Sequence, residues 1–183
     1  MAKLVDALRS ERSGSIPMRV QVPPSAPHMK VQFIFGGGKY DDEVRDLAEA
    51  YIARVGRYAE CRTALIACKA KDEDGIREEE SEAMLRAIAP HDFVLLFDER
   101  GKELSSEELA TMVDRHLQSG ISSMVVIVGG AYGVNDAVRV RANFTIAFSR
   151  MIFPHQLARV MALEQVYRAY SIVKGSKYHH AST

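Results

Sequence analysis

Three turns in the sequence have the residue types of a binding site for a small organic ligand. They lie at residues 97–101, 129–133 and 148–153. Gly129 has no side chain, so the backbone there could approach a ligand closely. In the third turn, Met151, Ile152 and Phe153 offer apolar walls beside backbone hydrogen-bonding groups. Taken alone, the Gly129 turn does not match the G-x-G-x-x-G pattern and is typical of an ordinary tight turn, and the apolar side chains are more typical of a core than of a binding site.

A second group of candidate residues lies at the C-terminal end of the chain. Tyr178, His179 and His180 combine an aromatic ring with two groups that can accept a proton near neutral pH. Such a tail could complete an active site, although chain ends are more often frayed. Arg168 lies in the helix before it, where Glu164 is spaced to pair with it one turn away.

Short apolar strands alternate with helices along the rest of the chain. The strands are expected at residues 31–35, 63–67, 93–97, 124–128 and 144–148. The helices are expected at residues 41–55, 76–89, 105–117, 134–141 and 154–173. Ser105 and Glu108 form a capping box at the start of the third helix. Continuously apolar strands predict a mostly parallel sheet with helices on both faces, whose ligand sites lie at the carboxyl ends of the strands.

The composition favours one compact domain. The chain has 183 residues, a hydrophobic fraction of 47% and a formal net charge of zero. No apolar run is long enough for a membrane span, and no secretory signal is visible, so we expect a cytoplasmic protein. Cys61 and Cys68 have neither metal-ligand nor redox-motif spacing, so no metal is predicted.

The charges are unevenly distributed. Residues 71–82 hold seven acids and two bases, which is typical of a solvated helix face. Residues 139–180 hold seven Lys or Arg residues and one acid, which could form a surface that faces phosphates. Arg159 and Arg168 are expected to project from the last helix. His155, at the start of that helix, could equally pack internally or contact RNA.

Residues 1–28 differ from the rest of the chain, because they are rich in Pro, Ser and Arg and have no sustained periodicity. Their possible codons resemble, in order, the D-arm, the T-arm and the CCA end of a transfer RNA. We therefore interpret them as a non-native or disordered leader that precedes a true start at Met29. A flexible basic arm that touches RNA is the alternative. Residues 29–183 form the expected domain.

Several segments together resemble a known family. They are FDERGKELSSEELA, VVIVGGAYG, FSRMIFPHQLARVMALEQVYRAYSI and KYHH. They resemble the ribosomal RNA large subunit methyltransferase H family of the SPOUT superfamily, over residues 29–180. The resemblance implies a homodimer with a C-terminal trefoil knot, which periodicity could not reveal. It also implies S-adenosylmethionine as cofactor and methylation at N3 of a pseudouridine in large-subunit ribosomal RNA, within assembled ribosomes.

The same resemblance implies roles for individual residues. The cofactor would be held by Phe97, Gly129, Phe148, Ser149, Arg150, Met151, Ile152 and Phe153. His179 would be a base for the proton on the acceptor nitrogen, Arg168 would stabilise negative charge on the ring, and Tyr178 would stack on the flipped base. The last helix is apolar almost all round, so a dimer interface would cover it.

Two features depart from the family pattern. The chain has His180 followed by Ala-Ser-Thr where the family has a terminal Lys or Arg, and it has Gly36-Gly37-Gly38 where the family has one glycine before the lysine. Two other functions are compatible with the sequence. One is a non-catalytic RNA-binding or ribosome-assembly module on the same fold, and the other is an unknotted α/β enzyme that binds a nucleotide phosphate at Gly129.

Overall fold

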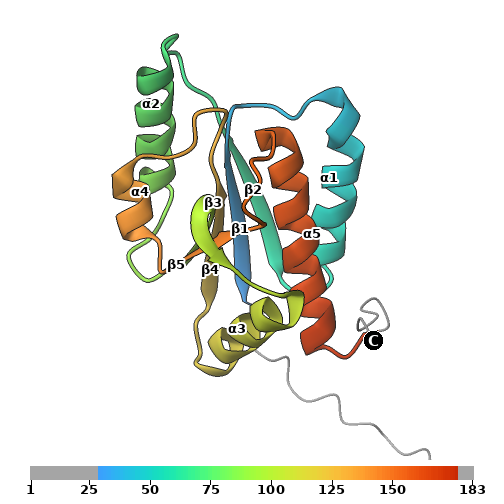
Figure 1. Cartoon of the computed structure of the whole chain (residues 1–183). Helices are drawn as coiled ribbons and strands as arrows, with labels where there is room; N and C mark the ends of the chain where they lie inside the picture. Colours follow the sequence, from blue (N-terminus) through green and yellow to red (C-terminus); the bar gives the residue numbers. More distant parts are fainter. Residues whose placement is uncertain (1–28, 177–183) are drawn as a thin grey trace, which may run out of the picture.

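The computed structural model describes residues 29–176 as one parallel sheet flanked by helices (Figure 1). The five strands are β1 (Lys30–Gly36), β2 (Glu60–Ile66), β3 (Phe93–Glu103), β4 (Ser123–Val128) and β5 (Phe144–Ala147). They lie in the order β2-β1-β4-β3-β5, and every neighbouring pair is parallel. The predicted α/β class with a parallel sheet is confirmed.

Two layers of helices cover the two faces of the sheet (Figure 1). The helices are α1 (Asp42–Val55), α2 (Glu73–Arg86), α3 (Ser106–Gln118), α4 (Asp136–Arg141) and α5 (His155–Val173). The α5 helix contacts α1 and α3 over one face, whereas α2 contacts α4 over the other. Because side chains alternate along a strand, Phe33 and Phe35 of β1 pack in the first layer and Ile34 packs in the second.

The β3 strand is longer than the sequence predicts. The strand was expected to end at Phe97, but it runs on to Glu103 through polar residues. Ile146 of β5 pairs with Phe97 and again with Lys102, so the intervening part of β3 arches past β5. In Figure 1 this part is the curled ribbon beside the β3 label. Polarity suggested a loop, but pairing with β5 satisfies the backbone groups and extends the strand.

The helix boundaries depend on local capping chemistry. Ser105 accepts a hydrogen bond from the Glu108 amide at 3.2 Å, and the Glu108 carboxylate accepts one from the Ser105 amide at 2.8 Å, which confirms the predicted capping box of α3. The α2 helix begins at Glu73, three residues earlier than expected. The reason is Asp72, whose side chain accepts a hydrogen bond from the Gly75 amide at 2.8 Å.

Candidate active site

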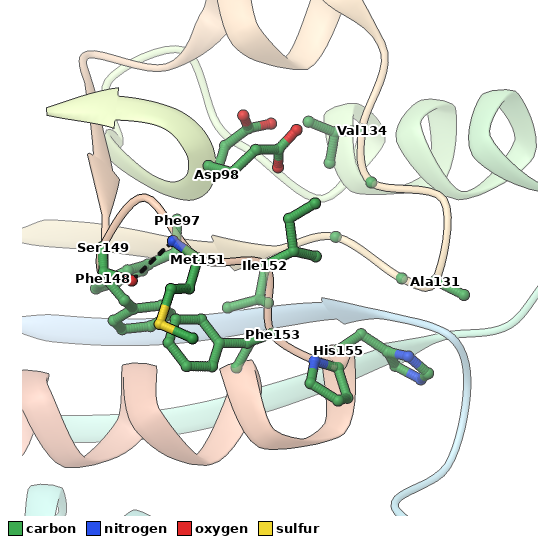
Figure 2. A pocket seen from close by; sticks show the side chains of 17 residues that line it. Phe97, Asp98, Ala131, Val134, Phe148, Ser149, Met151, Ile152, Phe153 and His155 are labelled. Carbon is green, nitrogen blue, oxygen red and sulfur yellow. Dashed lines mark hydrogen bonds between the residues drawn. The ribbon is translucent and has the colours of Figure 1, made fainter.

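A cavity of about 560 Å³ lies at the carboxyl ends of β3, β4 and β5 (Figure 2). All three turns that the sequence singled out contribute to it. Its lining from these turns and their neighbours is Phe97, Asp98, Glu99, Val128, Gly129, Gly130, Ala131, Gly133, Val134, Phe148, Ser149, Met151, Ile152 and Phe153, followed by Pro154, His155 and Ala158. Sheets of parallel strands commonly bind ligands at this end, and the volume suits a small organic molecule.

Aromatic rings form one wall of this cavity. Phe97 and Phe148 are stacked, with ring centroids 4.7 Å apart and planes inclined by 17°. Phe153 meets Phe148 edge to face at 6.1 Å. Figure 2 shows the three side chains on the same side of the cavity. The apolar surface that Phe97 and Phe148 offer suits a planar ring of a ligand.

The loop after β5 forms the adjoining rim. The Met151 amide donates a hydrogen bond to the Ser149 hydroxyl at 3.0 Å, which fixes the turn of the loop. The Met151 and Ile152 side chains line the cavity and are also exposed. Arg150 is different, because its side chain is 96% exposed, does not line the cavity and lies 3.7 Å from the Glu103 carboxylate.

Gly129 lines the cavity, and the structure gives a second reason for a glycine at this position. A Cβ atom there would lie 2.7 Å from the carbonyl carbon and 2.8 Å from the Cα atom of Gly133. The missing side chain therefore leaves room for the turn itself, in which the Gly133 amide donates to the Gly130 carbonyl at 3.1 Å. Gly133 has a φ of +72°, in the region that favours glycine.

Acidic side chains, which the sequence did not lead us to expect, contribute to the same rim. Asp98 comes directly after Phe97 in β3, and its buried carboxylate lies 3.1 Å from the Arg139 guanidinium of α4. Glu99 also lines the cavity and is half exposed. The signal was present in the sequence, since both acids come directly after the apolar part of the strand. Because Arg139 balances the charge of Asp98, the Glu99 carboxylate is the one of the two that favours a ligand with positive charge.

His155 also lines the cavity, at the first turn of α5 (Figure 2). Burial lowers the pKa of its imidazole below the usual 6.5, and the positive charge of Arg159 acts in the same direction. Asp41 opposes these two effects. The side chain is therefore held in its neutral form, which can both donate and accept a hydrogen bond.

Of the three residues expected to act on the acceptor, only Arg168 lies within residues 29–176. Tyr178 and His179 lie outside the described residues. Arg168 does not line the cavity, because it lies 13 residues along α5 from His155, which is about 20 Å of helix. Its guanidinium contacts the Glu164 carboxylate at 2.5 Å, which confirms the predicted pair.

The basic residues of the C-terminal half are mostly engaged inside the domain. Arg139 contacts Asp98, and Arg141 donates to the carbonyls of Ala89 and Asp92 at 2.9 Å. Arg159 was expected to project from the last helix, but it is fully buried. The reason is that it points to the end of β1, where it donates hydrogen bonds to backbone carbonyls. Within residues 29–176, the predicted phosphate-facing surface is therefore smaller than the sequence count suggested.

Other features limit the kinds of site present in residues 29–176. No group of three or more His, Cys, Asp or Glu side chains in this part of the chain could hold a metal ion. None of its helices has the length and apolar character needed to cross a membrane. The two cysteines in it are free thiols.

Known proteins with similar sequences identify the family. A family model described as "Predicted SPOUT methyltransferase" matches residues 29–179. The ribosomal RNA large subunit methyltransferase H of Geotalea daltonii is 37% identical over 157 residues, which cover 83% of this chain and 100% of the relative. The protein of that name from Clostridium beijerinckii is 38% identical over 160 residues, which cover 82% of this chain and 99% of the relative.

The fold also matches a solved structure. The crystal structure of a probable methyltransferase from Bordetella pertussis Tohama I superposes with a TM-score of 0.53 at 15% identity, covering 78% of this chain and 95% of that one. At this identity the likeness concerns the fold alone. The family model and the two relatives, by contrast, span nearly all of the described residues, so the chain belongs to the ribosomal RNA large subunit methyltransferase H family of SPOUT methyltransferases.

Proposed function

We propose that this protein transfers a methyl group from S-adenosylmethionine to N3 of a pseudouridine in large-subunit ribosomal RNA, within assembled ribosomes in the cytoplasm. The observation that carries the proposal is the cavity at the ends of β3, β4 and β5, whose lining fits this cofactor. Family membership supports ribosomal RNA as the methyl acceptor. The choice of pseudouridine N3 rests on the resemblance of the sequence segments to this family.

The cavity has a suitable partner for each part of S-adenosylmethionine. The Phe97 and Phe148 rings offer an apolar surface for the adenine, and the loop at residues 148–153 offers backbone groups for its polar edge. The carboxylate of Glu99 favours the positively charged part of the molecule. We assign cofactor contacts to Phe97, Gly129, Phe148, Ser149, Met151, Ile152 and Phe153, with Arg150 contributing through its backbone.

The bound cofactor would supply a methyl group that is already activated by its sulfonium, so the protein mainly has to align donor and acceptor. The acceptor nitrogen carries a proton between two carbonyls, and this proton must leave as the new N–C bond forms. We assign its removal to His179, stabilisation of negative charge on the ring to Arg168, and stacking on the flipped base to Tyr178.

These roles are best explained by a homodimer. Arg168 lies too far along α5 to reach the cavity of its own chain, so we propose that it acts at the partner's cavity. The exposed side of α5 is suited to pairing, because Leu157 is 44% exposed and Met161 lines a second cavity of about 440 Å³ with Leu47 of α1. Leu157→Glu should convert the dimer to a monomer in sedimentation. A wild-type protein that sediments as a stable monomer would refute the dimer.

We further propose that the chain is knotted. The support is the double pairing of Ile146, which lies between two parts of β3 and lets β5 pass through the arch formed by residues 98–101. The trefoil knot would bring residues 97–99 of β3 and the loop after β5 to one cavity. A high-resolution experimental structure tests the threading directly, and an unthreaded β5 would refute it.

The domain that performs this function is proposed to be residues 29–183, with residues 1–28 as a non-native leader. The family model also begins at Met29. Mass spectrometry of the protein from its native cell should find Met29 at the N-terminus. Recovery of a peptide from residues 1–28 would refute this part of the proposal.

Mapping ribosomal RNA modifications in cells that lack the protein tests the function. We expect loss of one methyl group from a pseudouridine of the large subunit, and its return when the gene is restored. Unchanged modification would favour the non-catalytic ribosome-assembly module. Binding of S-adenosylmethionine separates these two functions, because the assembly module has no need of it.

A further inference from the structure

Two buried charged residues, Glu80 and Arg159, have no part in the proposed methyl transfer. Arg159 is fully buried in α5 and Glu80 is 2% exposed in α2. The two helices lie on opposite faces of the sheet (Figure 1). Burying charged groups is costly unless they are paired and hydrogen-bonded, so their partners indicate what they do.

Both side chains bind the same short turn at the end of β1. The Glu80 carboxylate accepts a hydrogen bond from the Gly37 amide at 2.7 Å. From the other side, the Arg159 guanidinium donates to the Gly36 carbonyl and, at 3.2 Å, to the Lys39 carbonyl. The turn is therefore held between an acid from one helix layer and a base from the other.

Gly36 and Gly37 are required in this turn because the Glu80 and Arg159 side chains lie directly against its backbone. A Cβ atom on Gly37 would lie 2.6 Å from Arg159 Nη2, and one on Gly36 would lie 2.5 Å from Glu80 Oε2. Gly37 also has a φ of +89°, which side chains rarely tolerate. These steric demands explain why glycine occupies positions 36 and 37.

The same carboxylate touches the turn that lines the cofactor cavity. Glu80 Oε2 occupies the place where a side chain on Gly130 would lie, and a Cβ atom on Gly130 would also lie 3.0 Å from the Gly37 amide. On the Arg159 side, His155 and Ala158 of the same helical turns line the cavity. The Gly36–Gly38 turn thus joins two walls of the cavity, one in the turn after β4 and one in α5.

The charges of Glu80 and Arg159 each act on the pKa of the other residue. Burial raises the pKa of Glu80, whereas the Gly37 amide and the positive charge of Arg159 act in the opposite direction. Burial lowers the pKa of Arg159, and Tyr40, Glu80 and Asp41 act against this. Each charge therefore makes the other less costly to bury.

We propose that Glu80 and Arg159 are positioning residues that clamp the Gly36–Gly38 turn from opposite faces of the sheet and thereby set the geometry of the S-adenosylmethionine cavity. This proposal depends on the proposed function in one respect, because it assumes that the cofactor binds at Gly129 and Gly130. It acts from behind these glycines and makes no contact with the ligand. Its loss should reduce cofactor affinity in protein that is still folded.

Calorimetric titration with S-adenosylmethionine tests the clamp in the full chain. Glu80→Asp keeps the charge near Arg159 but is one methylene shorter, so it cannot reach both Gly37 and Gly130. We expect a fold-retaining variant whose affinity falls about tenfold, because a buried amide loses its acceptor. Glu80→Gln keeps the length and the acceptor, so it should restore much of the affinity when it folds. The matched control is Glu82→Gln, on the same helix but exposed, which should bind like the wild type.

A double-mutant cycle separates the clamp from a general loss of stability. If Glu80 and Arg159 act through one turn, Glu80→Asp with Arg159→Lys should weaken binding no more than the worse single variant. A lowered melting temperature with unchanged affinity in Glu80→Asp would overturn the proposal, because that is what a purely structural pair gives. A wild-type protein that does not bind the cofactor would instead refute the proposed function, so the two failures are distinguishable.

Discussion

Gly101 passes so close to Ile146 that a Cβ atom on Gly101 would lie 2.6 Å from the Ile146 amide nitrogen. Gly101 belongs to the part of β3 that arches past β5, and Ile146 is the β5 residue that pairs with β3 on both sides of this part. Residues 97–99 of β3 and the loop after β5 line one cavity beside this close approach.

Gly101→Ala should therefore destabilise the fold strongly. The added methyl group meets backbone atoms of β5 that cannot move aside, and overpacking of this kind costs about 1–3 kcal/mol or more. Chemical denaturation measures the loss. Gly56→Ala is the control, because Gly56 has a helical φ of −57° and only ordinary contacts, so alanine there should be neutral or slightly stabilising. Equal stability of Gly101→Ala and wild type would show that β5 is not enclosed this tightly.

Phe148→Leu should weaken S-adenosylmethionine binding. The leucine stays apolar but lacks the aromatic ring that is expected to contact the adenine, and an aromatic pair contributes about 0.5–1.5 kcal/mol, which corresponds to a roughly two- to tenfold change in Kd. Calorimetry gives the affinity. Phe144→Leu, at the other end of β5 and away from this cavity, should bind normally. If both variants bind equally well, the aromatic wall does not contact the cofactor.

His155 should make stability depend on pH. Its pKa in the folded protein is lowered from 6.5 by burial and by Arg159, with Asp41 opposing, so the folded state favours the neutral ring. The stabilisation is complete above pH 6.5 and is lost as pH falls from there through the lowered folded pKa. The difference in unfolding free energy between wild type and His155→Gln should shrink over that range. His91→Gln, at an exposed position, serves as the control, and a pH-independent difference for His155 would contradict the assignment.

The C-terminal tail should serve methyl transfer and not cofactor binding. Truncation after Ser176 removes Tyr178 and His179, so S-adenosylmethionine affinity should persist while transfer to ribosomes is lost. His179→Ala should lower transfer more than His180→Ala, because only His179 matches the family's terminal motif. A truncated enzyme with the full rate of transfer would mean that the base lies elsewhere, with His155 as the next candidate.

The sequence predicted the sheet and the position of the cavity well, because both follow from features that are local in the sequence. Apolar strands, caps and turns are short-range signals, and parallel strands necessarily bring their carboxyl ends to one edge. The polar extension of β3 was missed because its pairing depends on β5, which lies more than 40 residues away. Arg159 was placed on the surface because an arginine in a helix usually lies there, and only the end of β1 gives it buried partners.

In the candidate site, too, the contacts between residues far apart in the sequence could not be predicted. Phe97 and Phe148 could be assigned from the family resemblance, whereas the Asp98–Arg139 pair depends on α4 folding over the rim. Gly129 was assigned on the expectation that a ligand approaches its backbone, and the structure shows a further need for glycine that the sequence did not indicate. Its neighbour is the backbone of Gly133, a contact that depends on how the turn closes and not on spacing in the sequence.

Methyl transfer to purified ribosomes tests the central claim most directly. Ribosomes from cells that lack the protein would be incubated with the enzyme and S-adenosylmethionine carrying a labelled methyl group, and the ribosomal RNA mapped by mass spectrometry. The account predicts one labelled methyl group, on N3 of a pseudouridine in the large subunit, and slower labelling of the same position by Phe148→Leu at cofactor concentrations below its Kd. An enzyme that binds S-adenosylmethionine but leaves large-subunit RNA unlabelled would contradict it.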